Sequence, residues 1–347
     1  IAQFGQTKNW QTTDSTALFG QVDYKLTEAL SATVGMRYTW EDKDFDSVSS
    51  TTVQSGGIGN YVLASFATDS NSLSDEQFNW KLGLNYHFSE DVMAYVSAAT
   101  GFKSGGFNGG FLDPDPAVAS RQRQPVDAEE VTAYEIGLKA STMEGRLRLD
   151  VSAFYNDYKN QQVFALLPPV PGTLTPVNVL DNAKKAHTQG IDAQFSFDPV
   201  ESLSLTANIG LLDTELDEFI AQRDPSQPDF SGNELPFAPQ VTASLFAQWT
   251  HELGTGKLTV QASSNYRDKR FSDIDNNPFT ATDSLWLHNL RVGYEFSGGH
   301  WEVAAFARNL TDEEYFQQIF DLRDPFGYLQ GIVGMPRTIG VELNYQY

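Results

Sequence analysis

A strict two-residue alternation of apolar and polar side chains limits what this chain can fold into more than any other feature of its sequence. From Leu18 to Leu26 every second residue is apolar or glycine, and most residues between them are polar. The stretch from Leu30 to Trp40 repeats the pattern over a greater length. Because successive side chains of a strand point to opposite faces, the pattern predicts β-strands with one apolar and one polar face.

The same alternation recurs along the chain and predicts about thirteen strands. The expected spans are 15–26, 30–45, 77–88, 92–103, 130–141, 146–160, 187–198, 203–218, 239–251, 256–270, 283–296, 300–309 and 336–347. Residues 1–8 are expected to be the end of another strand. Many spans reach or exceed the ~9–11 residues that a tilted strand needs to cross a bilayer, whereas no apolar run approaches the ~20 residues of a spanning helix. If the chain crosses a membrane, it therefore does so as a β-barrel.

The connections between these strands alternate between short and long without exception. The short turns are expected at 27–29, 89–91, 142–145, 199–202, 252–255 and 297–299. The long connections are expected at 46–76, 104–129, 161–186, 219–238, 271–282 and 310–335. Outer-membrane barrels have this asymmetry, with tight turns in the periplasm and long loops outside the cell.

A soluble β-sandwich is the alternative, because a half-buried antiparallel sheet shows the same alternation. The uniform strand length and the unbroken order of hairpins argue against two packed sheets. Aromatic side chains also gather near strand ends, as at Tyr86 with Phe88 and Tyr294 with Phe296, where a membrane barrel meets the interface. We therefore expect an all-β fold, a transmembrane antiparallel up-and-down β-barrel.

Composition excludes several functions. The chain has no cysteine, which excludes disulfide scaffolds, thiolate metal sites and cysteine nucleophiles. Its formal net charge of -22 argues against binding nucleic acid. The first ten residues have neither the basic start nor the long apolar stretch of a signal peptide, so the start is expected to be mature, processed or truncated.

Five short motifs stand in order along the chain. They are Gly101–Asn108 (GFKSGGFN), Asn182-Ala183 with Ala186 and Gly190–Asp192, Leu235-Pro236 with Ala238-Pro239, Asn309–Asp312 with Tyr315, and Pro336–Thr338 before an aromatic C-terminus. Together they resemble the TonB-dependent receptor family of Gram-negative outer membranes, and the match covers nearly the whole chain.

The resemblance implies a protein larger than these residues. Members of the family share an N-terminal plug domain, which lies inside a barrel of about 22 strands. We therefore expect residues 1–347 to be the C-terminal part of such a barrel, with about 13–14 of its strands, and the plug and first strands to be absent from this chain. A smaller barrel that closes on itself is the competing interpretation.

The resemblance also implies active transport across the outer membrane. Extracellular loops would bind a scarce nutrient, such as a ferric siderophore, and the TonB complex would supply energy through the missing plug. The implied partners are outer-membrane lipid and lipopolysaccharide, the TonB complex and a small-molecule ligand such as a metal chelate, but no nucleic acid. A passive porin or hydrophobic-substrate channel without a plug is the alternative, and a surface enzyme or adhesin is a third class.

Candidate binding residues lie in the long connections and on the polar face. Guanidinium groups can bind anionic chelates and aromatic rings can stack on a ligand, although solvent exposure and packing between loops explain the same residues. The candidate ligand contacts are Phe107, Arg121, Arg123, Phe164, Phe326 and Tyr328. The residues expected to face the plug are Arg37, Lys81, Arg146, Arg148, Arg291 and Glu295.

No pattern in the sequence predicts catalysis, a resident metal or a cofactor. The five histidines are scattered without metal-like spacing. The acidic run from Asp213 to Glu218 fits a solvated strand end better than a calcium site. Neither a nucleophile elbow nor a glycine-rich phosphate loop occurs between a strand and a helix.

Overall fold

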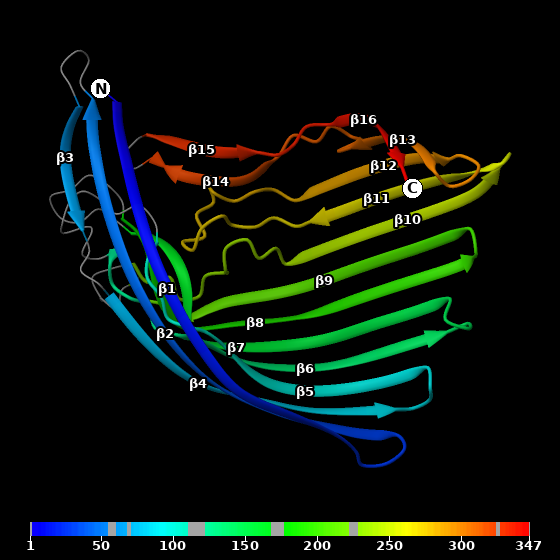
Figure 1. Cartoon of the computed structure of the whole chain (residues 1–347), viewed down its shortest axis with the longest axis horizontal. Coiled ribbons are helices and arrows are strands. Elements are labelled where there is room, and N and C mark those ends of the chain that lie inside the picture. The colour runs from blue at the N-terminus through cyan, green and yellow to red at the C-terminus, as the bar shows by residue number, and fades with distance from the viewer. Residues whose placement is uncertain are drawn as a thin grey trace.

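The computed structural model describes residues 2–54, 60–67, 71–109, 122–167, 177–221, 228–323 and 327–346, and strands make up most of it. Figure 1 shows a curved, twisted wall with short turns at one end and long connections at the other. Among the described residues, no helix is long and apolar enough to cross a bilayer. The strands are β1 (Ala2–Lys25), β2 (Leu30–Gln54), β3 (Asn60–Ala67), β4 (Asn71–His87), β5 (Val92–Lys103), β6 (Glu129–Thr142), β7 (Leu147–Leu167), β8 (Val177–Val200), β9 (Leu203–Glu218), β10 (Val241–Leu253), β11 (Gly256–Arg267), β12 (Leu285–Glu295), β13 (Trp301–Arg308), β14 (Phe316–Leu322), β15 (Tyr328–Val333) and β16 (Thr338–Tyr345).

The strands pair with their neighbours in chain order, as in an up-and-down barrel. The hydrogen-bonded path is β1-β2-β4-β5-β6-β7-β8-β9-β10-β11-β12-β13-β16, with β3 beside β2 and β14 paired with β15 in a separate hairpin. The expected all-β antiparallel fold is confirmed, and each expected span overlaps one strand of this path. In the described part of the chain, the path ends at β1 and at β16, so the sheet is open along their outer edges.

Several strands are longer than the alternation predicts, always at the end with the long connections. β1 and β2 stay paired as far as Ala2 and Gln54, and β7 and β8 as far as Leu167 and Val177. Residues from Ala2 onward therefore belong to β1, and the expectation that they end another strand is wrong. Ladder hydrogen bonds continue here without the alternation, because backbone pairing does not depend on the polarity of the side chains.

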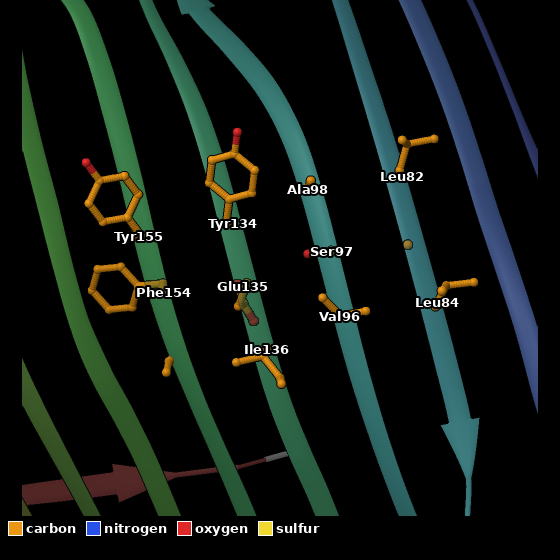
Figure 2. A pocket seen from close by; sticks show the side chains of 12 residues that line it. Leu82, Leu84, Val96, Ser97, Ala98, Tyr134, Glu135, Ile136, Phe154 and Tyr155 are labelled. Atoms are coloured by element: carbon orange, nitrogen blue, oxygen red, sulfur yellow. The ribbon is translucent and has the colours of Figure 1, made fainter.

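The register places apolar side chains in rows across one face, named here the apolar face. One row consists of Leu82, Ala98, Tyr134 and Tyr155, which are directly paired on β4 to β7. Figure 2 shows this row above a second one formed by Leu84, Val96 and Ile136. Ile136 is 61% exposed, as expected for a surface that faces no other protein layer.

The opposite face, named here the polar face, satisfies its side chains by pairing them across strands. Lys139 and Asp150 form an ion pair at 3.0 Å, Asn208 donates to Ser244 at 2.9 Å, and Asn289 donates to Ser263 at 3.0 Å. Such pairs join adjacent strands in addition to the ladder hydrogen bonds. The two faces therefore differ in solvent preference along the whole path.

The polar face is the concave one. Two carbonyls of the short segment after β5 accept hydrogen bonds from side chains of β1 and β7. Asn9 donates to the Gly109 carbonyl at 2.6 Å, and Gln162 donates to the Ser104 carbonyl at 2.9 Å. Four strands, β2, β4, β5 and β6, lie between β1 and β7 in the sheet. A six-residue segment can bridge them only because the sheet curls toward this side.

Candidate functional site

The loop after β5 is fixed on the polar face by a cluster of charged and aromatic contacts. Lys43 of β2 donates to the Ser104 hydroxyl at 2.6 Å and to the Gly105 carbonyl at 2.8 Å, and it pairs with Glu41 at 3.0 Å. The Phe45 and Phe107 rings stack with their centroids 5.1 Å apart. These residues belong to the GFKSGGFN motif and its partners, so the motif holds its loop against the wall.

Gly105 shows why this motif contains glycines. A β-carbon there would lie 2.7 Å from the Val126 carbonyl oxygen and 2.5 Å from the Leu73 side chain. The amide of Gly105 instead approaches Asp75 and donates to its carboxylate at 2.8 Å. Only a residue without a side chain permits this approach.

Asn182 on β8 connects the segment before β6 to the wall. Its side-chain oxygen accepts from the Asp127 amide at 2.8 Å, while its side-chain nitrogen donates to the carbonyls of Asp127 at 3.1 Å and Asn160 at 2.7 Å. Asn182 is buried and supplies a partner to three backbone groups, of which the Asp127 carbonyl also accepts from Gln162 at 3.1 Å. The second sequence motif therefore also has a structural role at this end of the sheet.

The main cluster of buried apolar residues lies at the same end, where residues of the connections pack on the ends of β7, β8 and β9. Leu216 and Phe219 at the end of β9 pack with Phe230 and with Ile274 from the connection between β11 and β12. Leu216 is on the polar face, because alternation along β9 places it with Leu212 and Gly210. The segments 228–235 and 271–276 thus fold inward over the polar face, sealed by a small core.

Paired asparagines and carbonyls join these two segments. The Glu234 amide donates to the Asn276 side chain at 2.7 Å, and Asn276 donates back to the Glu234 carbonyl at 2.9 Å. Asn233 also donates to the Ile274 carbonyl at 2.9 Å. The two connections therefore form one packed unit.

The β14–β15 hairpin is held to the connection between β11 and β12 by Asp321 and Arg323. Arg323 donates to both oxygens of Asp321, at 2.9 and 2.6 Å, and Asn277 donates to the same carboxylate at 2.7 Å. The Arg323 guanidinium lies 3.8 Å from the centroid of the Phe279 ring. These contacts, led by the Arg323 hydrogen bond, hold the pKa of Asp321 at about 2.

Asp273 has the opposite environment in the same connection. Its pKa is raised to about 7, first by burial and second by its hydrogen bond with Asp275. Part of this carboxyl group is fully buried without a partner among the described residues. A protonated Asp273 relieves both problems, because it carries no charge.

Two hollows on opposite faces of the described wall differ in character. The polar hollow, of about 560 Å³, extends over β5 to β11 and is lined by side chains such as Lys139, Asp192, Asn208 and Asn265. The apolar hollow, of about 530 Å³, lies where Ala98 leaves space between Leu82 and Tyr134 (Figure 2). Only the polar hollow lies on the concave face, below the inward-folded loops.

A family model described as "TonB dependent receptor-like, beta-barrel" matches residues 2–310. This chain belongs to the TonB-dependent receptor family. Its all-β fold and antiparallel strand order fit the barrel portion of such a receptor.

This receptor chain is similar in sequence or in fold to several known receptors. The pesticin receptor of Yersinia pestis is 24% identical over 345 residues, 97% of this chain and 44% of that receptor. The metal-pseudopaline receptor CntO of Pseudomonas aeruginosa is 24% identical over 348 residues, 98% of this chain and 42% of that receptor. The crystal structure of the ferric yersiniabactin uptake receptor FyuA from Yersinia pestis shares the fold with a TM-score of 0.78 and 19% identity, over 99% of this chain and 47% of that one. The chain thus spans less than half the length of each.

The four expected ligand contacts of this TonB-dependent receptor chain that the structure describes lie on different elements. Phe107 is stacked on Phe45, whereas Phe164 and Tyr328 are 63% and 50% exposed on β7 and β15. Arg123 is half-buried near the start of the segment before β6. Arg121 and Phe326 lie outside the described residues.

The residues expected to face the plug lie at different heights on the polar face. Arg37, Lys81 and Arg148 are exposed on β2, β4 and β7, and Glu295 is exposed at the end of β12. Arg291 is instead held between Glu302 at 2.9 Å and Glu342 at 3.4 Å. Arg146 lies in the turn before β7, where it donates to the carbonyls of Met143 and Pro199.

The acidic run at the end of β9 is paired and does not form a metal site. Asp217 lies 2.8 Å from His187, Glu218 pairs with Lys184 at 2.6 Å, and Asp213 accepts from Gln189 at 2.9 Å. Among the described residues, no group of three or more His, Cys, Asp or Glu residues is placed to hold a metal ion.

Sequence reasoning missed the small loop core and the arginines Arg267 and Arg270. Leu212, Thr214 and Leu216 alternate with the acidic residues, and that alternation was a usable signal for a buried side at the end of β9. No comparable signal marks the arginines, because their environment is made by segments distant in the sequence.

Asn182→Ala is predicted to loosen the segment before β6. The change removes the side-chain acceptor of the Asp127 amide and one donor from each of the Asp127 and Asn160 carbonyls, which costs about 2 kcal/mol. Hydrogen exchange of residues 122–128 in the complete receptor is expected to accelerate. Asn208→Ala is the control, because that side chain makes one exposed bond, to Ser244; equal exchange in the two variants would contradict the role of Asn182.

The connection between β11 and β12 is predicted to lose stability as the pH rises from about 4 to about 7. The folded connection raises the pKa of Asp273 from 3.8 to about 7, so it binds a proton that the unfolded connection has released in this range. Opening measured by hydrogen exchange of residues 272–280 is expected to be about tenfold more frequent above this range, after allowance for solvent screening of a partly exposed group.

Asp273→Asn is expected to remove this pH dependence, whereas Asp268→Asn, three residues before the connection turns inward, is expected to keep it. A pH dependence that survives in Asp273→Asn would assign the effect to another group.

Proposed function

We propose that this chain is the C-terminal barrel part of an outer-membrane receptor that binds a scarce nutrient outside the cell and imports it with energy from the TonB complex. A ferric or other metal chelate, such as a siderophore, is the proposed nutrient class. The apolar face then contacts the hydrocarbon of the outer membrane, and the polar face lines the lumen.

The observation that carries this proposal is the inward packing of the long connections over the polar face of a receptor-family barrel. Loops that fold over a polar lumen create a chamber that a small ligand must enter before it crosses. The names of the relatives support the ligand class, since they include a ferric yersiniabactin uptake receptor and a metal-pseudopaline receptor.

The proposed ligand contacts are the aromatic and cationic residues of this chamber. Phe164 and Tyr328 are exposed, and Phe107 extends the Phe45 stack toward the same end. Arg121, Arg123 and Phe326 remain proposed contacts on the strength of their position in the long connections.

The complete protein is proposed to include a plug and further strands, which would bring the barrel to about 22 strands. The exposed Arg37, Lys81 and Arg148 on the lumen wall, with Arg146, Arg291 and Glu295, are the proposed contacts of that plug. A plug is needed because a barrel of this size encloses a lumen much wider than a nutrient. It is also the proposed contact with the TonB complex.

Outer-membrane lipid and lipopolysaccharide are the proposed partners of the apolar face. The aromatic pairs Tyr86 with Phe88 and Tyr294 with Phe296 lie next to short turns, as expected for rings at the periplasmic interface. Tyr134 and Tyr155 lie toward the opposite end of the same face.

Deletion of the complete gene from its host is predicted to abolish growth on at least one ferric chelate under iron limitation. A plasmid copy should restore uptake of that radiolabelled chelate, and inactivation of TonB should abolish it again. The same purified protein should show no steady conductance in a planar bilayer. Uptake that survives loss of TonB, together with steady conductance, would instead establish a passive channel.

A further inference from the structure

Two arginines lie where the connection between β11 and β12 leaves the wall. Arg267 is the last residue of β11 and pairs with Thr242 and Leu285, which places it on the polar face with Asn265 and the polar hollow. Arg270 follows three residues later and forms an isolated bridge with Thr282. Both residues therefore lie between the inward-folded loops and the lumen wall.

Neither guanidinium has an acidic partner in the part of the chain that the structure describes. Arg267 donates only to the Asp283 carbonyl, at 3.4 Å, and Arg270 only to the Gln317 carbonyl, at 3.1 Å. The Nε atoms of both are buried without a hydrogen-bond partner. By contrast, Arg291, Arg323 and Arg337 each pair with a carboxylate.

This arrangement leaves two positive charges partly removed from water and close to each other. Burial lowers the pKa of both guanidinium groups, and the charge of Arg267 lowers that of Arg270 further. Buried charges and unsatisfied donors cost free energy unless an opposite charge binds them. Each group still has unused donors in the planar fork that fits an oxyanion.

Aromatic rings lie beside the pair. The Arg270 guanidinium is 5.1 Å from the centroid of the Phe237 ring, and Tyr315 is close enough to Arg267 to interact with it electrostatically. A ligand that binds here thus meets two cations and aromatic surface together, a combination suited to a carboxylate or phenolate on a flat organic group.

We propose that Arg267 and Arg270 form an oxyanion-binding site at the mouth of the lumen, which selects anionic chelates as the receptor's ligands. This inference rests on the proposed function, because it treats the lumen mouth as part of the ligand's path. The carboxylate or phenolate groups of the chelate would donate no proton and accept hydrogen bonds from both guanidinium groups.

The test uses the complete receptor in detergent, with citrate as the anionic probe and its neutral trimethyl ester as the control. Isothermal titration is expected to detect salt-sensitive binding of citrate and none of the ester. The double variant R267Q/R270Q should weaken citrate binding about tenfold or more. R337Q is the matched control, since it removes a loop arginine that already pairs with Asp312.

R267K/R270K decides the matter if the glutamine variant fails to fold. It keeps both charges but loses the planar forks, so citrate should still bind, with about three- to tenfold lower affinity. Equal binding of citrate by the wild type and either double variant overturns the proposal. So does the absence of citrate binding by the wild type, which is the result expected if an acidic group of the plug already neutralises the pair.

The uptake experiment separates failure of this site from failure of the proposed function. Citrate binding that depends on the arginines, without any TonB-dependent uptake, leaves the site in place and removes the transport role. TonB-dependent uptake of a chelate that R267Q/R270Q leaves unchanged keeps the transport role and removes the site.

Discussion

The requirement that every backbone amide and carbonyl find a partner governs the rest of this structure. In hydrocarbon no water can supply that partner, so strands must pair along their whole length. The path from β1 to β16 achieves this with neighbours in chain order, and no strand on it needs a distant partner. Alternation accompanies this pairing, because each paired strand contributes one side to the apolar face and the other to the polar face.

At the end of the sheet with the long connections, backbone amides and carbonyls also have hydrogen-bond partners, but side chains provide them. There the backbone of the long connections is satisfied by side chains from the wall: Asn182 binds both polar groups of Asp127, and Asp75 accepts from Gly105. Lys43 and the small core around Leu216 and Phe219 then hold the loops inward. The inward fold of these loops over the polar face is therefore a consequence of how they satisfy their polar groups.

The wall could be predicted from the sequence because its determinants are local. β9 begins and ends where the alternation predicts, at Leu203 and Glu218, and the short turns fall between the expected strands. The extensions of β1 and β2 could not be predicted, because backbone pairing continues there without a two-residue pattern of apolar side chains.

The candidate site could be predicted only in part, because its contacts join segments far apart in the sequence. Phe107 was correctly placed in a loop, but its stack on Phe45 depends on how that loop folds. Arg267 looks like any charged strand end in the sequence, and only the surrounding segments make it a cation without an acidic partner in the described chain. Family motifs located the loops but not the side chains that meet inside them.

The most direct test of the two-faced wall uses the absence of cysteine from this chain. Single cysteines introduced at successive positions from Arg148 to Tyr155 of β7 can carry a nitroxide spin label in the complete receptor in its native membrane. The account predicts that Leu149, Val151, Ala153 and Tyr155 are accessible to oxygen dissolved in lipid, while the residues between them are accessible to a water-soluble nickel complex. Accessibility without this two-residue alternation would contradict it.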